Sequence, residues 1–407
     1  WYSARTASAT MRVNSFMCNS DMDDLNMGTD TSVKNELNTG TDPGVKKAGK
    51  KRGLKVLLIV LATLAVLVLS LWLLQRLLLP KYISSNEEGL LVKEYYDYAG
   101  GNDVLFVGDC EVYSNFSPVK MWTEYGITSA IRGSPQQLIW HSYYMLEDTL
   151  RYETPKVVVF NVLSMKYGEP QKEAYNRLAL DGMKWSSVKQ QAIKASMMSD
   201  ESMLSYVFPL LRYHSRWSEL KAEDVKYMFS TKQLSHNGYV MRVDVKPVTT
   251  VPREKPLADY SFADVCWEYL DKMRTLCESK GIKLVLIKAP TVMPHWYDEW
   301  EAQIVDYADK YGLDYVNFLK EDVLTATGLD YSTDTFDAGQ HMNLSGAEKL
   351  AVWFGAYLRD NAGLADHRGD NDLAAKWQSK IDYYEEMKAA QYRQLEENGK
   401  VDSYWGD

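Results

Sequence analysis

The sequence predicts an α/β protein in which helices cover both faces of a mainly parallel β-sheet, preceded by one membrane-spanning helix. From about residue 104 to about residue 358, short apolar runs alternate with segments of helical periodicity, as in βαβ units. The runs are apolar throughout, which is typical of strands buried on both faces. A separate run of nineteen uncharged residues, Val56–Leu74, is long enough to cross the hydrocarbon core of a bilayer.

Composition limits the classes of function. The 407 residues allow one large domain or two, and a hydrophobic content of 46% is enough for a sizeable core. The net charge of −9, without a basic stripe outside the N-terminal region, argues against a nucleic-acid partner. The four cysteines, Cys18, Cys110, Cys266 and Cys277, indicate neither a disulfide framework nor a zinc site, so we expect no cofactor and no metal.

The N-terminal region predicts topology. Residues 1–53 are rich in small polar residues and are predicted to be a disordered cytoplasmic tail, followed by a transmembrane helix over 54–79. Basic residues gather at 46–55, before the apolar run, which places the N-terminus in the cytoplasm. We therefore expect a single-pass protein of the cell membrane with its domain outside. A cleaved signal peptide is the alternative, but the run is long and no small-residue cleavage site follows.

The elements of the sheet domain, expected over residues 80–368, follow in chain order. Strands are predicted at 104–107, 129–131, 156–162, 282–287 and 315–318. Helices are predicted at 135–151, 261–280, 298–311 and 344–358, with Ser345 and Glu348 as a capping box at the start of the last.

Two segments lie outside this alternation. Residues 165–260 are predicted to be a helical insertion that forms a cap beside the strand ends. Its aromatic residues either pack within the cap or stack on sugar rings: Trp185, Tyr213, Trp217 and Tyr227. Residues 369–407 are predicted to be an amphipathic helix over 370–397 and a tail. That helix either docks on the domain or contacts a partner.

The turn after the first strand carries the first candidate for chemistry. Val104–Val107 runs into Gly108-Asp109-Cys110, so Cys110 lies at the carboxyl end of a strand, where open α/β sheets bind their ligands. If a helix starts there, its free N–H groups and positive dipole end favour a thiolate and an oxyanion. The alternative is a small buried cysteine, which is a common structural residue.

Gly108-Asp109-Cys110 resembles the first block of the SGNH/GDSL hydrolase superfamily, which usually reads Gly-Asp-Ser with serine as the nucleophile. The departure is cysteine at position 110. The resemblance implies a three-layer α/β/α, flavodoxin-like domain with Cys110 as the nucleophile.

A second segment, Phe336–Asn343, resembles the final block of the same superfamily, in which an Asp shortly precedes a His. The resemblance implies that His341 is the base and Asp337 its orienting group. Asp337 lies four residues before His341 where the usual spacing is three, so Asp334 is a second candidate for the orienting role.

The resemblance also implies three oxyanion donors, namely the backbone N–H of Cys110, the N–H of Gly133 and the side-chain amide of Asn161. The last two follow the second and third predicted strands. A Gly or an Asn at a strand end is also common turn chemistry.

The implied activity is that of a membrane-anchored acyl esterase or O-acyltransferase using Cys110, His341 and Asp337. The membrane-anchored layout is similar to extracytoplasmic acyltransfer proteins of bacterial surface polymers, which implies an acylated carbohydrate or surface polymer as substrate. A membrane-protein partner stays open. The alternative is a catalytically degenerate module of the same fold that binds a surface glycan or a partner protein.

Overall fold

The computed structural model describes residues 43–80, 90–226, 228, 233–251 and 253–401, so the predicted tail over 1–42, Cys18 and Tyr227 lie outside the described residues. Contacts divide the chain into two units, 1–65 and 66–407. The helix α1 (Pro43–Leu78) runs from the first unit into the second.

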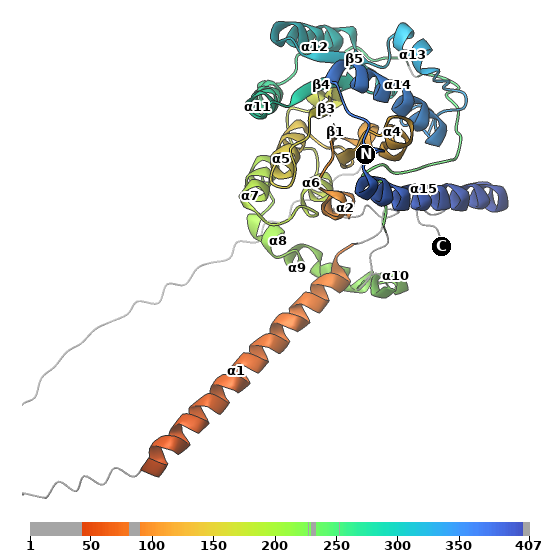
Figure 1. Cartoon of the computed structure of the whole chain (residues 1–407). Coiled ribbons are helices and arrows are strands. Elements are labelled where there is room, and N and C mark those ends of the chain that lie inside the picture. The colour runs from red at the N-terminus through yellow and green to blue at the C-terminus, as the bar shows by residue number, and fades with distance from the viewer. Residues whose placement is uncertain (1–42, 81–89, 227, 229–232, 252, 402–407) are drawn as a thin grey trace, which may run out of the picture. The chain divides into compact units, whose positions relative to one another are not determined.

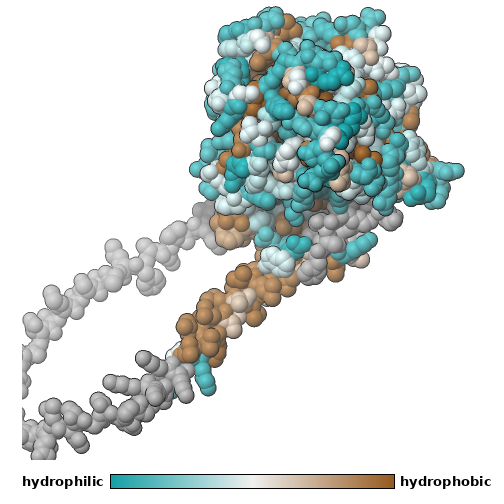
Figure 2. Space-filling model, in the orientation of Figure 1, coloured by the Kyte–Doolittle hydropathy of each residue, from teal (hydrophilic) through white to brown (hydrophobic). Residues whose placement is uncertain are grey.

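α1 begins earlier than predicted, because residues 43–53, expected in the tail, are already helical. Pro43 suits a first helical position, where its missing N–H costs no hydrogen bond. Within α1, Arg52–Leu78 has a mean hydropathy of 2.9 and is not buried, which makes it long and apolar enough to cross a membrane. Figure 2 shows its hydrophobic surface.

The second unit contains the predicted sheet. Its strands are β1 (Val104–Gly108), β2 (Ser129–Gly133), β3 (Val157–Asn161), β4 (Lys283–Lys288) and β5 (Asp314–Asn317). The order is β2-β1-β3-β4-β5 and every neighbouring pair is parallel. This flavodoxin-like order confirms the fold class. The chain passes from β1 to β2 on one side and to β3 on the other, so β1 borders the switch point where such sheets bind ligands.

The helices of this unit occupy the following residues: α2 (Leu90–Tyr98), α3 (Cys110–Tyr113), α4 (Pro118–Tyr125), α5 (Ile139–Thr149), η2 (Val162–Lys166), α6 (Glu173–Leu180), α7 (Ser187–Ser196), α8 (Met203–Val207), α9 (Leu210–Tyr213), η3 (His214–Ser218), α10 (Ala222–Lys226), α11 (Asp264–Lys280), α12 (Asp298–Tyr311), α13 (Glu321–Thr327), α14 (Leu344–Ala362) and α15 (Asn371–Asn398).

Alternate residues of each strand enter separate hydrophobic cores. Leu105 and Val107 pack with α5, α11 and α12, whereas Val104 and Phe106 pack with α4 and α14. Figure 1 shows these helices on opposite sides of the strands. Because side chains alternate across a strand, the continuous apolar runs fill both cores, which gives the predicted three-layer α/β/α architecture.

One predicted helix start and one predicted helix cap are wrong. α5 begins at Ile139 rather than near Pro135, because His141 Nδ1 accepts the N–H of Leu138 at 3.1 Å and fixes the helix start there. α14 is not capped by Ser345 and Glu348. Asn343 is its N-cap, with its side chain accepting the N–H of Gly346 at 3.2 Å.

The segment predicted as a cap does not form a unit of its own. Helices α6 and α7 extend the core on the α5 side of the sheet. Of the aromatic residues named for the cap, Tyr213 is buried, whereas Trp185 and Trp217 are exposed.

Residues 234–248, here called the edge segment, run beside β2. Asn237 accepts the N–H of Ile131 at 2.9 Å, and its side chain donates to the carbonyl of Ser129 at 3.0 Å. Gly238 has a φ of +92°, and a Cβ there would lie 2.2 Å from the Ile131 carbonyl oxygen, so the close approach requires glycine. The edge segment therefore covers hydrogen-bonding groups that β2 would otherwise leave open.

α15 docks on the sheet domain, the first of the two alternatives for the C-terminal helix. Trp377 stacks on Trp122 of α4 with ring centroids 5.0 Å apart. Tyr384 is buried, and its hydroxyl donates to Glu348 of α14 at 3.0 Å.

Candidate active site

Cys110 is the first residue of α3 and lies directly after β1. The Asp109 side chain caps the helix by accepting the N–H of Glu111 at 3.1 Å. A Cβ at Gly108 would lie 2.4 Å from a methyl group of Val112, so glycine is what lets the chain turn this tightly into α3. The Cys110 thiol is partly exposed and is a free cysteine.

The structure brings Cys110 and His341 together, although they are far apart in the chain. The thiol and the imidazole interact through charge and a side-chain hydrogen bond. His341 Nδ1 lies 2.5 Å from Asp337 Oδ2, and the His341 backbone N–H donates to Asp337 Oδ1 at 2.8 Å. Since Asp337 occupies Nδ1, the nitrogen left for the thiol is Nε2. The catalytic roles of the three residues stay a prediction.

The additional residue between Asp337 and His341 is accommodated by the backbone. Ala338 and Gly339 adopt positive φ angles of 62° and 92°, which coil the loop so that the carboxylate reaches back to the ring. The second candidate, Asp334, is engaged elsewhere. It binds Lys349 at 2.6 Å and Ser345 at 2.8 Å.

The two side-chain donors of Asn161 are both occupied. They donate to Asp109 Oδ1 at 3.2 Å and to Glu111 Oε2 at 2.9 Å, and the amide oxygen accepts the N–H of Ala289 at 3.2 Å. The predicted oxyanion role of Asn161 therefore requires that one of these bonds be released.

Gly133 ends β2, paired with Gly108 of β1. A Cβ at Gly133 would lie 3.2 Å from the Gly108 carbonyl oxygen and 3.2 Å from the Tyr113 ring. Close packing is thus sufficient reason for glycine here, and its role as an oxyanion donor stays a prediction.

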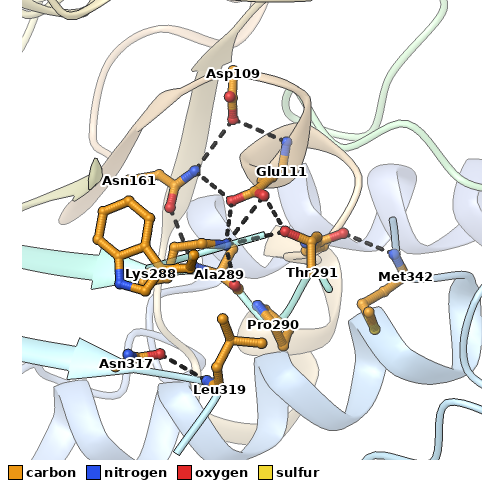
Figure 3. Close-up of polar contacts among 12 residues, drawn as sticks. Asp109, Glu111, Asn161, Lys288, Ala289, Pro290, Thr291, Asn317, Leu319 and Met342 are labelled. Atoms are coloured by element: carbon orange, nitrogen blue, oxygen red, sulfur yellow. Dashed lines mark hydrogen bonds and ion pairs between the residues drawn. The ribbon is translucent and has the colours of Figure 1, made fainter. Parts of the chain in front are cut away.

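A buried polar network that we did not predict from the sequence contains Glu111, the residue that follows Cys110 in the chain (Figure 3). Lys288 Nζ contacts both carboxylate oxygens of Glu111, at 3.0 and 3.1 Å, and the two side chains are 0% and 2% exposed. Lys288 also donates to the carbonyl of Ala289 at 2.7 Å and to the Thr291 hydroxyl at 3.1 Å. The Thr291 hydroxyl in turn donates to Glu111. The network ties the end of β4 to α3 and, through Asn161, to β3.

A separate contact joins the two halves of the site. The side-chain oxygen of Asn115, which follows α3, accepts the N–H of Met342 at 2.9 Å. Met342 directly follows His341, so this bond fixes the histidine loop against the segment that carries Cys110. Phe336 stacks on the His341 ring with centroids 5.6 Å apart and restricts its tilt.

The electrostatics of the site couple the protonation of Cys110 to that of His341. Burial raises the pKa of the Cys110 thiol, the charge of His341 lowers it, and the carboxylates of Asp109 and Glu111 raise it. Burial opposes the charge of His341, but the Cys110 thiolate and the hydrogen bond to Asp337 raise its pKa to about 11. Burial and then the charge of Glu111 raise the pKa of Asp109 to about 6. The Cys110 thiolate and the His341 imidazolium each favour the charged form of the other, so the two groups titrate as a pair.

Among the residues that the structure describes, no three His, Cys, Asp or Glu side chains are grouped as a metal site would need.

The comparisons with known proteins are sparse. No family model matches the sequence, and no curated protein matches it. Several solved structures are similar, among them two from Bacteroides. One is a protein assigned as an acylhydrolase from Bacteroides fragilis, at 11% identity and a TM-score of 0.30, with 71% of this chain and 94% of that chain covered. The other is a GDSL-like lipase from Bacteroides thetaiotaomicron, also at 11% identity and a TM-score of 0.30, with 66% of this chain and 99% of that chain covered.

At this identity and TM-score, neither similarity bears on the activity of this chain. The fold itself is the one that the resemblance implied, since a parallel sheet of flavodoxin-like order places Cys110 at the carboxyl end of β1, beside His341. The chain is thus an α/β protein with a parallel sheet of flavodoxin-like order, and among the described residues one helix is long and apolar enough to span a membrane.

Proposed function

We propose that the protein is a membrane-anchored acyl esterase or O-acyltransferase that forms an acyl-thioester on Cys110. The observation that carries the proposal is the contact of three groups in the order that acyl transfer needs. Cys110 meets His341, and Asp337 holds the other ring nitrogen at 2.5 Å. Nucleophile, base and orienting carboxylate come from two distant segments, which makes the arrangement more specific than either segment alone.

In the first step, the Cys110 sulfur attacks the carbonyl carbon of an ester and the C–O bond to the alcohol breaks. His341 accepts the thiol proton and delivers it to the departing alkoxide, while Asp337 stabilises the imidazolium. In the second step, water or a sugar hydroxyl gives a proton to His341 and attacks the thioester carbonyl carbon. The C–S bond breaks, and the Cys110 sulfur takes the proton back from His341. The backbone N–H groups of Cys110 and Gly133 are the proposed oxyanion donors, together with Asn161 once one of its bonds is released.

The substrate class that we propose is an acylated carbohydrate or surface polymer outside the membrane. The support is the layout, in which a basic cluster precedes the apolar segment of α1 and the sheet domain follows it. Transfer to a hydroxyl is favoured over hydrolysis, since a thioester yields readily to a positioned hydroxyl.

The test is acyl-enzyme trapping with the full chain in detergent or nanodiscs. Wild type incubated with an activated acetyl ester should gain one acetyl group by intact mass spectrometry, located on Cys110 by peptide mapping. Cys110→Ala should gain none, and Cys110→Ser should retain part of the activity. Cys277→Ala is the matched control, because Cys277 is buried and burial raises its pKa to about 12.

The second candidate is a degenerate module that binds a surface glycan or a partner protein. Two observations favour it, namely the occupied donors of Asn161 and the raised pKa of the Cys110 thiol. If Cys110→Ala hydrolyses the ester as fast as wild type and no acetyl group is found on Cys110, the enzyme proposal fails and the binding module takes its place.

A further inference from the structure

An exposed hydrophobic patch lies on α8, α9 and η3, away from the residues of the candidate active site. We define the apolar patch by five residues: Leu204, Val207, Phe208, Leu211 and Trp217. They are 39% to 72% exposed, Trp217 the most. Scattered apolar residues are normal on protein surfaces, but large apolar side chains gathered in one short segment mark an interaction surface.

The patch spans two short helices. Leu204 and Val207 lie three residues apart on α8, Phe208 ends that helix, and Leu211 follows on α9. The opposite face carries Tyr206 and is packed inward.

Tyr206 and Tyr213 are both buried, and both contact the guanidinium group of Arg177, at 3.6 and 6.0 Å from the ring centroids. Arg177 also donates to the Ser205 hydroxyl at 2.6 Å. The segment is therefore held on the domain by polar and aromatic contacts, while its apolar side chains are turned outward.

The patch is continuous with the end of the membrane-spanning candidate. Arg216, next to Trp217, donates to the carbonyl of Leu78, the last residue of α1, at 2.5 Å. Arg76 donates to the carbonyl of Met228. A hollow of about 350 Å³ is lined by residues of both elements, among them Arg76 and Val207. Residues of α2 and of 181–189, including Lys93, Asp181 and Lys189, also line it.

We propose that the apolar patch inserts into the interface of the bilayer that α1 crosses, as a second membrane contact of the domain. The occupant is lipid at the boundary between headgroups and acyl chains. The contact of Arg216 with Leu78 holds the patch beside the end of a span, at the level where the hydrocarbon core gives way to headgroups. An exposed tryptophan and arginines are the residues that favour this level. The proposal is independent of the acyltransfer proposal.

The experiment measures immersion of single spin labels in the full chain, reconstituted at one copy per nanodisc of phosphatidylcholine and phosphatidylglycerol. The background carries Cys18→Ser and Cys110→Ala. Labels are placed at Phe208→Cys and Leu211→Cys, with Val251→Cys as the matched control. Val251 is also an apolar residue with an exposed fraction of 55%, the same as that of Phe208, but it lies outside the patch.

Collision of each label with oxygen, which partitions into lipid, is compared with collision with a water-soluble nickel chelate. We expect oxygen to dominate at 208 and 211 and nickel at 251. Adding Leu204→Glu to the Leu211→Cys chain should shift that label towards nickel, while the circular dichroism spectrum stays unchanged because Leu204 is exposed.

Equal, nickel-dominated collision at all three positions would overturn the proposal. A label at 208 that is water-exposed in nanodiscs but protected in native membranes would also overturn it, and would assign the patch to a protein partner instead.

Discussion

Lys288→Met would leave the carboxylate of Glu111 buried beside Cys110 without its cation. The two side chains are 0% and 2% exposed, and Lys288 makes two contacts to the carboxylate and two further hydrogen bonds. Removing one partner of such a buried pair costs about 3–5 kcal/mol, because the remaining charge has neither its partner nor water. We expect Lys288→Met to reduce the free energy of unfolding by an amount in this range.

The companion variant separates charge from packing. In Glu111→Gln/Lys288→Met the amide keeps much of the shape and hydrogen bonding of Glu111 without its charge, so part of the loss should be recovered. Residues in one network typically show coupling energies of about 0.5–3 kcal/mol, and we expect a value near the upper end. The assay is urea unfolding of the full chain in detergent, followed by tryptophan fluorescence.

An exposed ion pair provides the control. Lys272 and Glu268 lie 2.6 Å apart on α11, with side chains 41% and 61% exposed. Lys272→Met should cost no more than about 0.5 kcal/mol, since water already solvates both charges. Two results would refute the reasoning that the network acts as a buried unit. One is a cost for Lys288→Met as small as that for Lys272→Met. The other is a double variant that loses the sum of the stability losses of Glu111→Gln and of Lys288→Met measured singly.

Three further outcomes are expected. Asp337→Asn should lower kcat/KM for an activated ester by about 10²–10⁴-fold, because the ring loses the carboxylate that orients and charges it, whereas Asp334→Asn should act on stability instead. Iodoacetamide should modify Cys110 slowly at neutral pH and faster as pH rises, since its raised pKa keeps the thiol protonated. Asp109→Asn should speed that reaction at mildly alkaline pH by removing a negative charge, and an unchanged rate would contradict this assignment. Gly108→Ala should lower the free energy of unfolding by about 1–3 kcal/mol in the same urea assay, because the added methyl group overlaps α3.

The strands and the principal residues of the candidate site could be read from local pattern. A strand buried on both faces has to be apolar throughout, so β1 and β4 are visible in the sequence. Their carboxyl ends then locate the turn that carries Cys110. Asp337 and His341 are close in the chain, so their pairing could also be predicted from the local sequence. The positive φ angles of Ala338 and Gly339, which let the carboxylate reach the ring at a spacing of four, could not be predicted.

The buried network could not be read in this way. Charged residues such as Glu111 and Lys288 are almost always solvated, so their sequence neighbours give no reason to expect an ion pair. Only the sheet order, which places β4 beside β3, brings Lys288 to Asn161 and Glu111. One feature of the sequence did point to the network. Lys288 directly follows an apolar run, and a lysine in that position must be either solvated or paired with a negative charge.

The start of α5 and the cap of α14 were missed for a related reason. The ring of His141 accepts the N–H of Leu138 at the start of α5, and Asn343 accepts the N–H of Gly346 at the start of α14, whereas spacing alone does not decide which side chain bonds these groups. The packing of the insertion could not be predicted either, because apolar residues of α7 read equally well as the core of a cap or as an extension of the sheet domain.

The edge segment connects the edge of β2 with the loop that carries His341. The chain that covers β2 continues to the histidine loop, where the carbonyl of Arg242 accepts the N–H of Leu344 and Lys246 donates to the carbonyl of Thr335 at 2.8 Å. Trimming the insertion to leave a minimal sheet would therefore do two things at once. It would bare a strand edge that invites pairing between molecules, and it would free the loop that holds His341. We therefore expect any version of the protein that lacks the edge segment both to aggregate and to lose the geometry of the site.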